Sequence, residues 1–191
     1  GGACATVSIW SALQSSAFDE HHAIPTTAEI TEAAHLKASL GDRTFPSSGL
    51  NLIQLREAIK ELDLAPVDQI GDLNPLAPGD LERFSVKKFV SSYAAFLRSG
   101  YPVIVLGQLQ GTGLHAVCFV GFREAAPTTL TPPNIELQDS TTTVFYVHDD
   151  NLGPNVRVEV ADDGTGCAIF KPRAPTMVYG PKTFPDPTLS F

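Results

Sequence analysis

The residue types that could do chemistry in this chain are a cysteine near its start, a histidine in its second half and two aspartates further on. Cys4 follows two glycines and directly precedes an amphipathic pattern over residues 7–13. A helix beginning there places the thiol in the first turn, where free backbone N–H groups and the helix dipole favour a thiolate. We therefore predict that Cys4 is a nucleophile and that the fold brings a base to it. The alternative is a small buried side chain that begins a core helix.

The histidine best placed to act as that base is His115. It follows the turn Gly111-Thr112-Gly113 and opens an apolar run, so we expect it at a sheet edge beside an open loop. A polar side chain at the start of such a run is disfavoured unless it has a role. The other histidines of the first half, which we predict to be solvated or structural, are His21, His22 and His35.

The strand predicted over residues 144–149 ends in the sequence His148-Asp149-Asp150. Side chains alternate along a strand, so Asp149 shares a face with the apolar residues of the run while His148 points to the other face. If consecutive strands pair, this end lies near His115, and a carboxylate there would orient the imidazole through a hydrogen bond. The alternative is that the aspartates only form a turn by bonding to nearby backbone N–H groups.

Four amphipathic patterns predict helices in the first 99 residues. In the first pattern Val7, Trp10 and Leu13 recur every three residues with Ile9 and Ala12 beside them, and we predict that these residues form the buried stripe. In the second, Thr26 and Glu29 have the spacing of a capping box. The predicted helices cover residues 4–13, 26 to 36 or 40, 52–62 and 85–97, and Ser99-Gly100 is expected to end the last one.

After residue 100 the pattern changes to short, apolar, β-branched runs. They predict strands at 102–106, 115–122, 144–149, 156–160 and 167–170, with a further one at 177–179. Helices followed by a meander of strands indicate an α+β fold with an antiparallel sheet rather than a doubly wound α/β fold. We expect a single domain over residues 1–191, with a helical part at about 1–99 and a sheet part at about 100–180.

The order Cys, His, Asp and the segments around these residues resemble the papain-like cysteine peptidases, nearest their bacterial bacteriocin-processing (double-glycine peptidase-like) branch. Gly2-Ala3-Cys4 is similar to the Gly-[Ser/Ala]-Cys core of the papain signature. Residues 114–122 are similar to the family's His-Ala-Val-x-x-Val-Gly-aromatic strand. Residues 101–105 resemble the strand before it, and residues 145–153 resemble the strand that carries the third triad member.

The resemblance implies a papain-like fold and a cysteine peptidase-like hydrolase acting on a peptide or other acyl substrate. Cys4 would be the nucleophile, His115 the acid and base, and Asp149 the residue that orients His115. Counting as in the bacteriocin-processing branch selects Asp149, whereas counting back from Gly153 as in papain selects Asp150; strand alternation favours Asp149. The family also has a glutamine oxyanion donor shortly before the cysteine, which here would lie upstream of the first residue.

Three other functions stay open for the same residues. An acyl transferase would use the same triad and pass the acyl group to an amine or thiol instead of water. A metal site would use His115, His148 and Asp149, although alternation puts the last two on opposite faces. A binding or scaffold module would keep the fold with little or no turnover. We predict neither a cofactor nor a metal.

Charge and composition restrict the partners. The formal net charge is -8 and the sequence pI about 5.0, so no basic stripe is available for nucleic acid. We predict no membrane partner, because no apolar run has spanning length. The odd number of cysteines, 3, and the absence of a signal peptide favour a cytoplasmic, reducing location. The chain begins with Gly1 and not Met, so we expect it to be part of a longer polypeptide.

Overall fold

The computed structural model describes residues 3–14, 23–35, 49–68, 86–109, 113–125, 142–162, 168–173 and 189–190. The helices within these ranges are α1 (Cys4–Ala12), α2 (Thr27–Ala33), α3 (Leu52–Glu61) and α4 (Val86–Arg98). The strands are β1 (Val103–Leu109), β2 (Gly113–Glu124), β3 (Thr142–Asp149), β4 (Gly153–Asp162), β5 (Ala168–Arg173) and β6 (Leu189–Ser190). The described helices include none that combines the length and the apolar character needed to cross a bilayer.

The first three helices begin in two different ways. At α2 the predicted capping box is present: the Glu29 backbone N–H donates to the Thr26 hydroxyl at 3.3 Å, and the Thr26 N–H donates to the Glu29 carboxylate at 2.7 Å. Helix α3 has an equivalent box between Asn51 and Gln54 that we did not predict. Helix α1 has no side-chain cap at Ala3, so the N–H groups of its first turn are not all used within the helix.

The predicted buried stripe of α1 is wrong at Trp10, whereas Ile9, Ala12 and Leu13 are buried as predicted. Trp10 is 40 % exposed, whereas Ile9 is 1 % exposed and Ala5 is 1 % exposed. Residues three apart advance by only about 300° around a helix, so a stripe built on that spacing drifts away from the core, whereas the row i, i+4 stays closer to one face. Ala5, Ile9 and Leu13 form that row and all three are buried.

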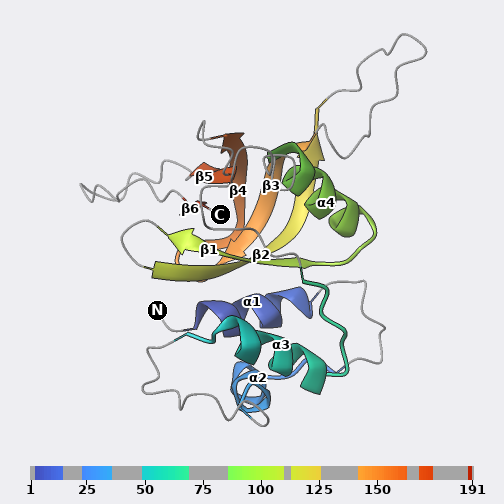
Figure 1. Ribbon diagram of the computed structural model, residues 1–191, viewed down its shortest axis with the longest axis vertical. Coiled ribbons are helices and arrows are strands. Elements are labelled where there is room, and N and C mark those ends of the chain that lie inside the picture. The colour runs from blue at the N-terminus through green and yellow to red at the C-terminus, as the bar shows by residue number, and fades with distance from the viewer. Residues whose placement is uncertain are drawn as a thin grey trace, which may run out of the picture.

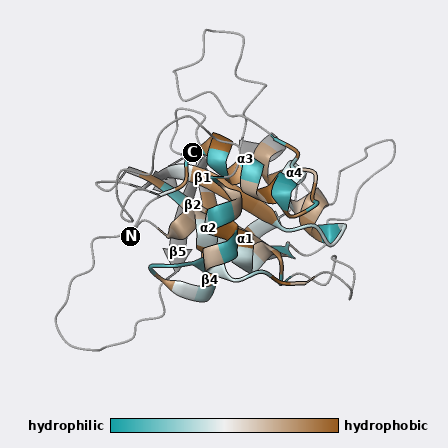
Figure 2. Ribbon diagram, turned by 90° about the horizontal axis from the view of Figure 1, so that it is seen from below, coloured by the Kyte–Doolittle hydropathy of each residue, from teal (hydrophilic) through white to brown (hydrophobic). Residues whose placement is uncertain are grey.

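The other helices also refine the prediction. Helix α2 ends at Ala33, earlier than expected, because the chain turns at Ala34 and the His35 N–H donates to the Glu32 carbonyl oxygen. Helix α4 ends at Arg98, directly before the predicted terminator Ser99-Gly100, and Gly100 has a φ of 85° that glycine adopts without strain. Hydrophilic and hydrophobic residues are both present on α2, α3 and α4 (Figure 2).

The strands form an antiparallel sheet, as predicted. Each strand from β1 to β5 pairs with the next one along the chain, and β6 pairs with both β5 and β1, which closes the sheet into a barrel. The closing strand lies at 189–190, beyond the predicted end of the sheet part at about 180. The strand predicted at 177–179 falls outside the described residues. The fold is therefore mixed α+β with an antiparallel sheet.

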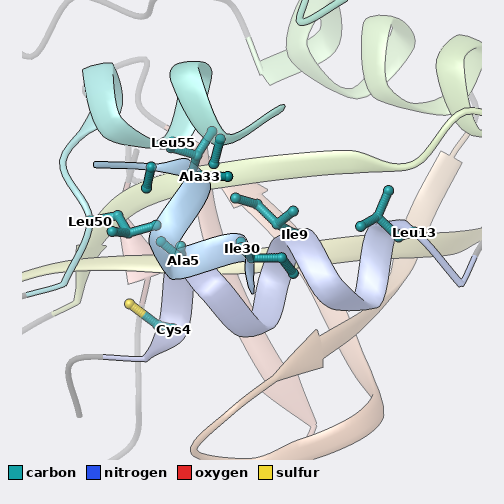
Figure 3. Packing of buried hydrophobic residues seen from close by; sticks show 11 residues of the cluster. Cys4, Ala5, Ile9, Leu13, Ile30, Ala33, Leu50 and Leu55 are labelled. Carbon is teal, nitrogen blue, oxygen red and sulfur yellow. The ribbon is translucent and has the colours of Figure 1, made fainter. Parts of the chain in front are cut away.

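Two buried clusters show how helices and strands pack. The first joins α1, α2 and α3 to one face of β1 and β2, and Figure 3 shows Ile9 of α1 beside Ala33 and Leu55 in this cluster. The second joins α4 to the other face of the strands through Val90, Val117 and Phe119, among others. Helix α1 lies between the sheet and the pair α2 and α3, whereas α4 covers the sheet on its own side (Figure 1). Helix α4 therefore packs with the sheet part rather than with the other helices.

Candidate active site

The first turn of α1 positions Cys4. It is the first residue of the helix and is 7 % exposed. Figure 3 shows Cys4 at the start of α1, ahead of Ala5 and Ile9 on the same helix. Free N–H groups and the positive end of the helix dipole surround a sulfur in this position and stabilise its anion. The glycines that precede it, residues 1 and 2, lie outside the described part of the chain.

Strand β2 carries His115 to Cys4 because it extends beyond its partner β3. The pairing of β2 with β1 runs from Phe119 back to Gly113, whereas its described pairing with β3 begins only at Cys118. The stretch before Cys118 therefore has one edge that β3 does not use. At this edge the backbone N–H of Ala116 donates a hydrogen bond to the Cys4 sulfur, and the His115 side chain forms a second hydrogen bond with it.

The end of β3 supplies the partner on the other side of the imidazole. His115 Nε2 lies 3.0 Å from Asp149 Oδ2, and both residues are buried. Because Nε2 faces the carboxylate, Nδ1 is the ring nitrogen left for Cys4. The antiparallel pairing of consecutive strands brings the start of β2 to the end of β3, which is the arrangement the sequence predicts.

Asp149 performs both of the roles that the sequence left as alternatives. Its Oδ2 accepts from His115, while its Oδ1 accepts from the backbone N–H groups of Asn151 at 2.7 Å and Leu152 at 3.2 Å. The carboxylate thus forms the turn between β3 and β4 and is held by that turn. The hydrogen bonds at Oδ1 hold the Asp149 side chain in one orientation, so Oδ2 is preorganised to accept from His115.

Asp150 is the second acidic residue beside the imidazole. Its Oδ1 lies 3.7 Å from His115 Nε2, beyond hydrogen-bond length, and its side chain is more exposed than that of Asp149. Asp149 is therefore the direct partner of the imidazole, and Asp150 acts on the site through its charge. That charge opposes a thiolate and raises the pKa of Cys4.

The electrostatics favour a charged pair. Burial alone would lower the pKa of His115, but the hydrogen bonds and charges of Asp149 and Cys4 raise it to about 10. Burial alone would raise the pKa of Cys4, but the hydrogen bonds from His115 and Ala116 outweigh it and the pKa is lowered from 9.0. The same balance lowers the pKa of Asp149, where burial is outweighed by its hydrogen bonds to His115 and to the turn. A thiolate and an imidazolium are thus both stabilised.

Cys118 provides an internal comparison for Cys4. It is fully buried in β2, and burial raises the pKa of its thiol to about 12. Both cysteines are free and buried, yet their pKa values move in opposite directions because only Cys4 has an imidazole and a backbone N–H beside its sulfur. Cys167 lies outside the described residues.

The alternative metal set of His115, His148 and Asp149 does not form. The His148 ring is directed away from His115, and its Nε2 lies 3.3 Å from Asn155 Oδ1 on the exposed side of β3. Within the described ranges, the group close enough to hold a cation is His115, Asp149 and Asp150. A cation on His115 Nε2 would have to replace the hydrogen bond to Asp149, so the contacts at Nε2 fit a proton better than a metal.

The remaining predicted residues lie elsewhere. His35 follows α2, and its Nδ1 lies 2.6 Å from the Thr31 carbonyl oxygen, so this ring nitrogen carries the proton. His21 and His22 fall outside the described residues. No sequence pattern indicates the Ala116 N–H at the Cys4 sulfur, because almost every residue has a backbone donor and it is the offset of β3 that leaves this one open.

A cavity of about 590 Å³ adjoins the start of α1. Its lining residues from α1 and α2 are Ala3, Thr6, Thr27, Ala28, Thr31 and Glu32, with His35 at its end. Ala3 is the residue before Cys4, so this cavity begins next to the candidate nucleophile. Sequence patterns did not predict it, because it forms between two helices separated by residues 13–26.

No protein-family model matches the chain, and neither a curated protein nor a solved structure matches it. The fold and the site therefore define only a general class: a mixed α+β protein in which a cysteine, a histidine and an aspartate are joined by hydrogen bonds at the meeting of a helix and a sheet.

Proposed function

We propose that this chain is a papain-like cysteine hydrolase that cleaves a peptide or other acyl substrate with Cys4, His115 and Asp149. The observation that carries the proposal is the continuous path from the Cys4 sulfur through the His115 ring to Asp149 Oδ2. Covalent catalysis requires a nucleophile that is hydrogen-bonded to a base, and a third residue that orients this base through a second hydrogen bond.

The chemistry follows from the charges of the pair. The Cys4 thiolate attacks the substrate carbonyl carbon, and the oxyanion forms near the N-terminus of α1, where the Cys4 backbone N–H is a donor. His115 Nδ1–H gives its proton to the leaving nitrogen as the C–N bond breaks, which leaves a thioester on Cys4. Water then attacks the thioester, His115 takes a proton from that water, and cleavage of the C–S bond restores the thiolate and imidazolium.

The arrangement of the fold supports this proposal. The nucleophile comes from a helix and the base from a strand, so the reacting groups meet at the boundary between α1 and the sheet (Figure 1). The bacteriocin-processing branch of the papain-like peptidases is the family that the sequence resembles. The same fold class and the same order of residues agree with that resemblance.

The test of the proposal combines turnover with thiol reactivity. The chain should hydrolyse members of a mixed fluorogenic peptide library, and Cys4→Ala and His115→Ala should each abolish this activity. In the unmodified protein, iodoacetamide should label Cys4 well below pH 7 and leave Cys118 unlabelled under native conditions. Full hydrolysis by Cys4→Ala would refute the proposal, and so would a Cys4 labelling profile that does not change in His115→Ala.

An acyl transferase is the second candidate, favoured by the burial of the site. Cys4 is 7 % exposed and His115 is 5 % exposed, so little water reaches the thioester directly and an amine acceptor could compete with it. Adding an amine during turnover distinguishes the two: a hydrolase gives mainly the free acid, whereas a transferase gives mainly the amide. Labelling of Cys4 without any turnover would instead favour the binding or scaffold module.

A further inference from the structure

The aspartate that follows Asp149 has no part in the proposed reaction, yet its carboxylate lies beside the same imidazole. Asp150 Oδ1 is 3.7 Å from His115 Nε2. Asp150 as a whole residue is exposed, but its side chain is only 15 % exposed. The described residues include no hydrogen-bond donor to this carboxylate, and the imidazole is the basic group within reach of it. A carboxylate shielded from water in this way is favoured by a positive charge beside it, which here is the charged form of His115.

The local structure at the end of β3 brings two consecutive carboxylates to one ring. Alternation along a regular strand would direct the side chains of Asp149 and Asp150 to opposite faces. However, β3 ends at Asp149, and its pairing with β4 has a register shift between Val147 and Asp149. Such a shift changes the direction of the side chains that follow it. A ring nitrogen of His115 and one oxygen of each aspartate therefore lie within 4.8 Å of one another.

The two carboxylates act differently on the resting pair. Among the described residues, the titratable groups that face the ring are Cys4 from α1, Asp149 from β3 and Asp150 from the turn that follows, while β1 places Gly107 opposite His115. Asp149 accepts the Nε2–H hydrogen bond. The charge of Asp150 raises the pKa of Cys4 and so opposes the thiolate. Asp150 therefore gives no advantage to the attack by Cys4, and its effect on the imidazole matters most when the sulfur carries no charge.

The sulfur carries no charge in the thioester, so the inference rests on the proposed function. The hydrogen bond and the charge with which Cys4 raises the pKa of His115 are lost when the sulfur is acylated. His115 Nδ1 must then be unprotonated to take a proton from water as the water oxygen attacks the thioester carbon. A negative charge 3.7 Å from Nε2 favours the protonated ring, which cannot take that proton. We infer that Asp150 is a positioning residue that holds His115 in its charged form and so sets the pH above which the thioester is hydrolysed.

The first experiment follows the ring without turnover. In Cys4→Ser the side chain at position 4 is uncharged, as the sulfur is in the thioester, and NMR spectroscopy of the imidazole C–H groups gives the pH at which each ring loses its proton. The His115 signal is the one that disappears when His115→Ala is added. Adding Asp150→Asn instead should lower the His115 midpoint by about one pH unit, the lower end of the range for a nearby opposite charge. Adding Asp150→Glu keeps the charge and should lower the midpoint less.

Asp63→Asn in the same Cys4→Ser background is the matched control. It makes the same chemical change in the turn after α3, at a φ of 59° that asparagine also adopts. The His115 midpoint should stay where it is in Cys4→Ser. If Asp150→Asn also leaves this midpoint unchanged, the inference is overturned.

The second experiment follows the thioester itself. With the p-nitrophenyl ester of a blocked amino acid, the burst of p-nitrophenolate reports acylation of Cys4, and the slower steady-state rate reports hydrolysis of the thioester. In Asp150→Asn the acid limb of the steady-state rate should have its midpoint about one pH unit lower, while the burst is unchanged or faster. An acid limb that does not move would overturn the inference. If the His115 midpoint moves but the unmodified chain gives no burst, the proposed hydrolysis fails and the effect of Asp150 on His115 stands.

Discussion

The replacement of Asp149 by asparagine tests the reasoning about the site most sharply, because the two side chains have the same shape. Asp149 offers two acceptor oxygens: Oδ2 serves His115 and Oδ1 serves the N–H groups of Asn151 and Leu152. Asparagine has one acceptor oxygen and one NH₂ donor group. In either orientation it therefore sets a donor against a donor, either at the imidazolium or at the turn.

The magnitude follows from the contact that is lost. A hydrogen bond between charged groups contributes about 1.5–3 kcal/mol, which corresponds to about 10- to 150-fold in rate or equilibrium. Asp149 is also the main group that holds the pKa of His115 near 10 against burial. Without this carboxylate the imidazole loses its proton at a lower pH, and the Cys4 thiolate loses the cation beside it.

The assay is the alkylation rate of Cys4 at pH 6, resolved from the other cysteines by peptide mass spectrometry. We expect Asp149→Asn to slow this rate by about 10- to 150-fold and to move the Cys4 profile to higher pH. Peptide hydrolysis should fall by at least the same factor. Cys118, buried in β2 with a pKa raised to about 12, should stay unreactive in both proteins.

Asp150→Asn is the matched control, since it makes the same chemical change one residue later. Asp150 is 3.7 Å from Nε2 and its charge raises the pKa of Cys4, so its removal should leave the alkylation rate at pH 6 unchanged or faster. If Asp149→Asn leaves the Cys4 profile where it is in the unmodified protein, the orienting role of Asp149 is refuted. If Asp150→Asn has the larger loss, the roles of the two aspartates are exchanged.

Three further predictions concern stability. Ile9→Ala should lower the free energy of unfolding by about 2–5 kcal/mol. Trp10→Ala should lower it less, because Trp10 is 40 % exposed whereas Ile9 is 1 % exposed. Urea unfolding measures both changes, and a larger loss for Trp10→Ala would contradict the buried face of α1. Thr26→Ala should cost about 0.5–2 kcal/mol through the capping box, and a double change with Glu29→Ala should cost less than the sum of the single changes. The lowered pKa of Asp149 stabilises the folded state fully above the unfolded pKa of 3.8, and this stabilisation is lost as the pH falls through the folded pKa. Asp149→Asn has no carboxylate to titrate, so its free energy of unfolding should fall less between neutral and acidic pH than that of the unmodified protein, as measured by acid unfolding with circular dichroism.

Local patterns were sufficient to predict that helices α1 to α4 and strands β1 to β5 exist, and to select the candidate pair. The capping box at Thr26 and the terminus at Gly100 depend on neighbouring residues alone, so spacing and residue type could predict them. The period of two along strands placed Asp149 on the buried side and His148 on the more exposed side of β3, as observed. Pairing of consecutive strands then brought His115 to Asp149.

Other features needed the tertiary structure. The buried face of α1 depends on which elements surround it, and residues three and four apart are too similar in direction for spacing alone to choose Ile9 over Trp10. Helix α4 precedes the strands in sequence, yet it packs on the face opposite to α1, because each face of the sheet needs an apolar cover.

The sequence by itself determined where a thiol, an imidazole and a carboxylate could lie within their elements, because helix and strand periods are local properties. Only the tertiary structure decided how these groups are bonded. The offset between β2 and β3 opens the Ala116 N–H to the Cys4 sulfur, and the α1–α2 contact forms the cavity. The turn after β3 holds Oδ1 of Asp149, while Oδ2 accepts from His115. Each of these depends on the register or packing of segments distant in the chain, which local residue patterns do not specify.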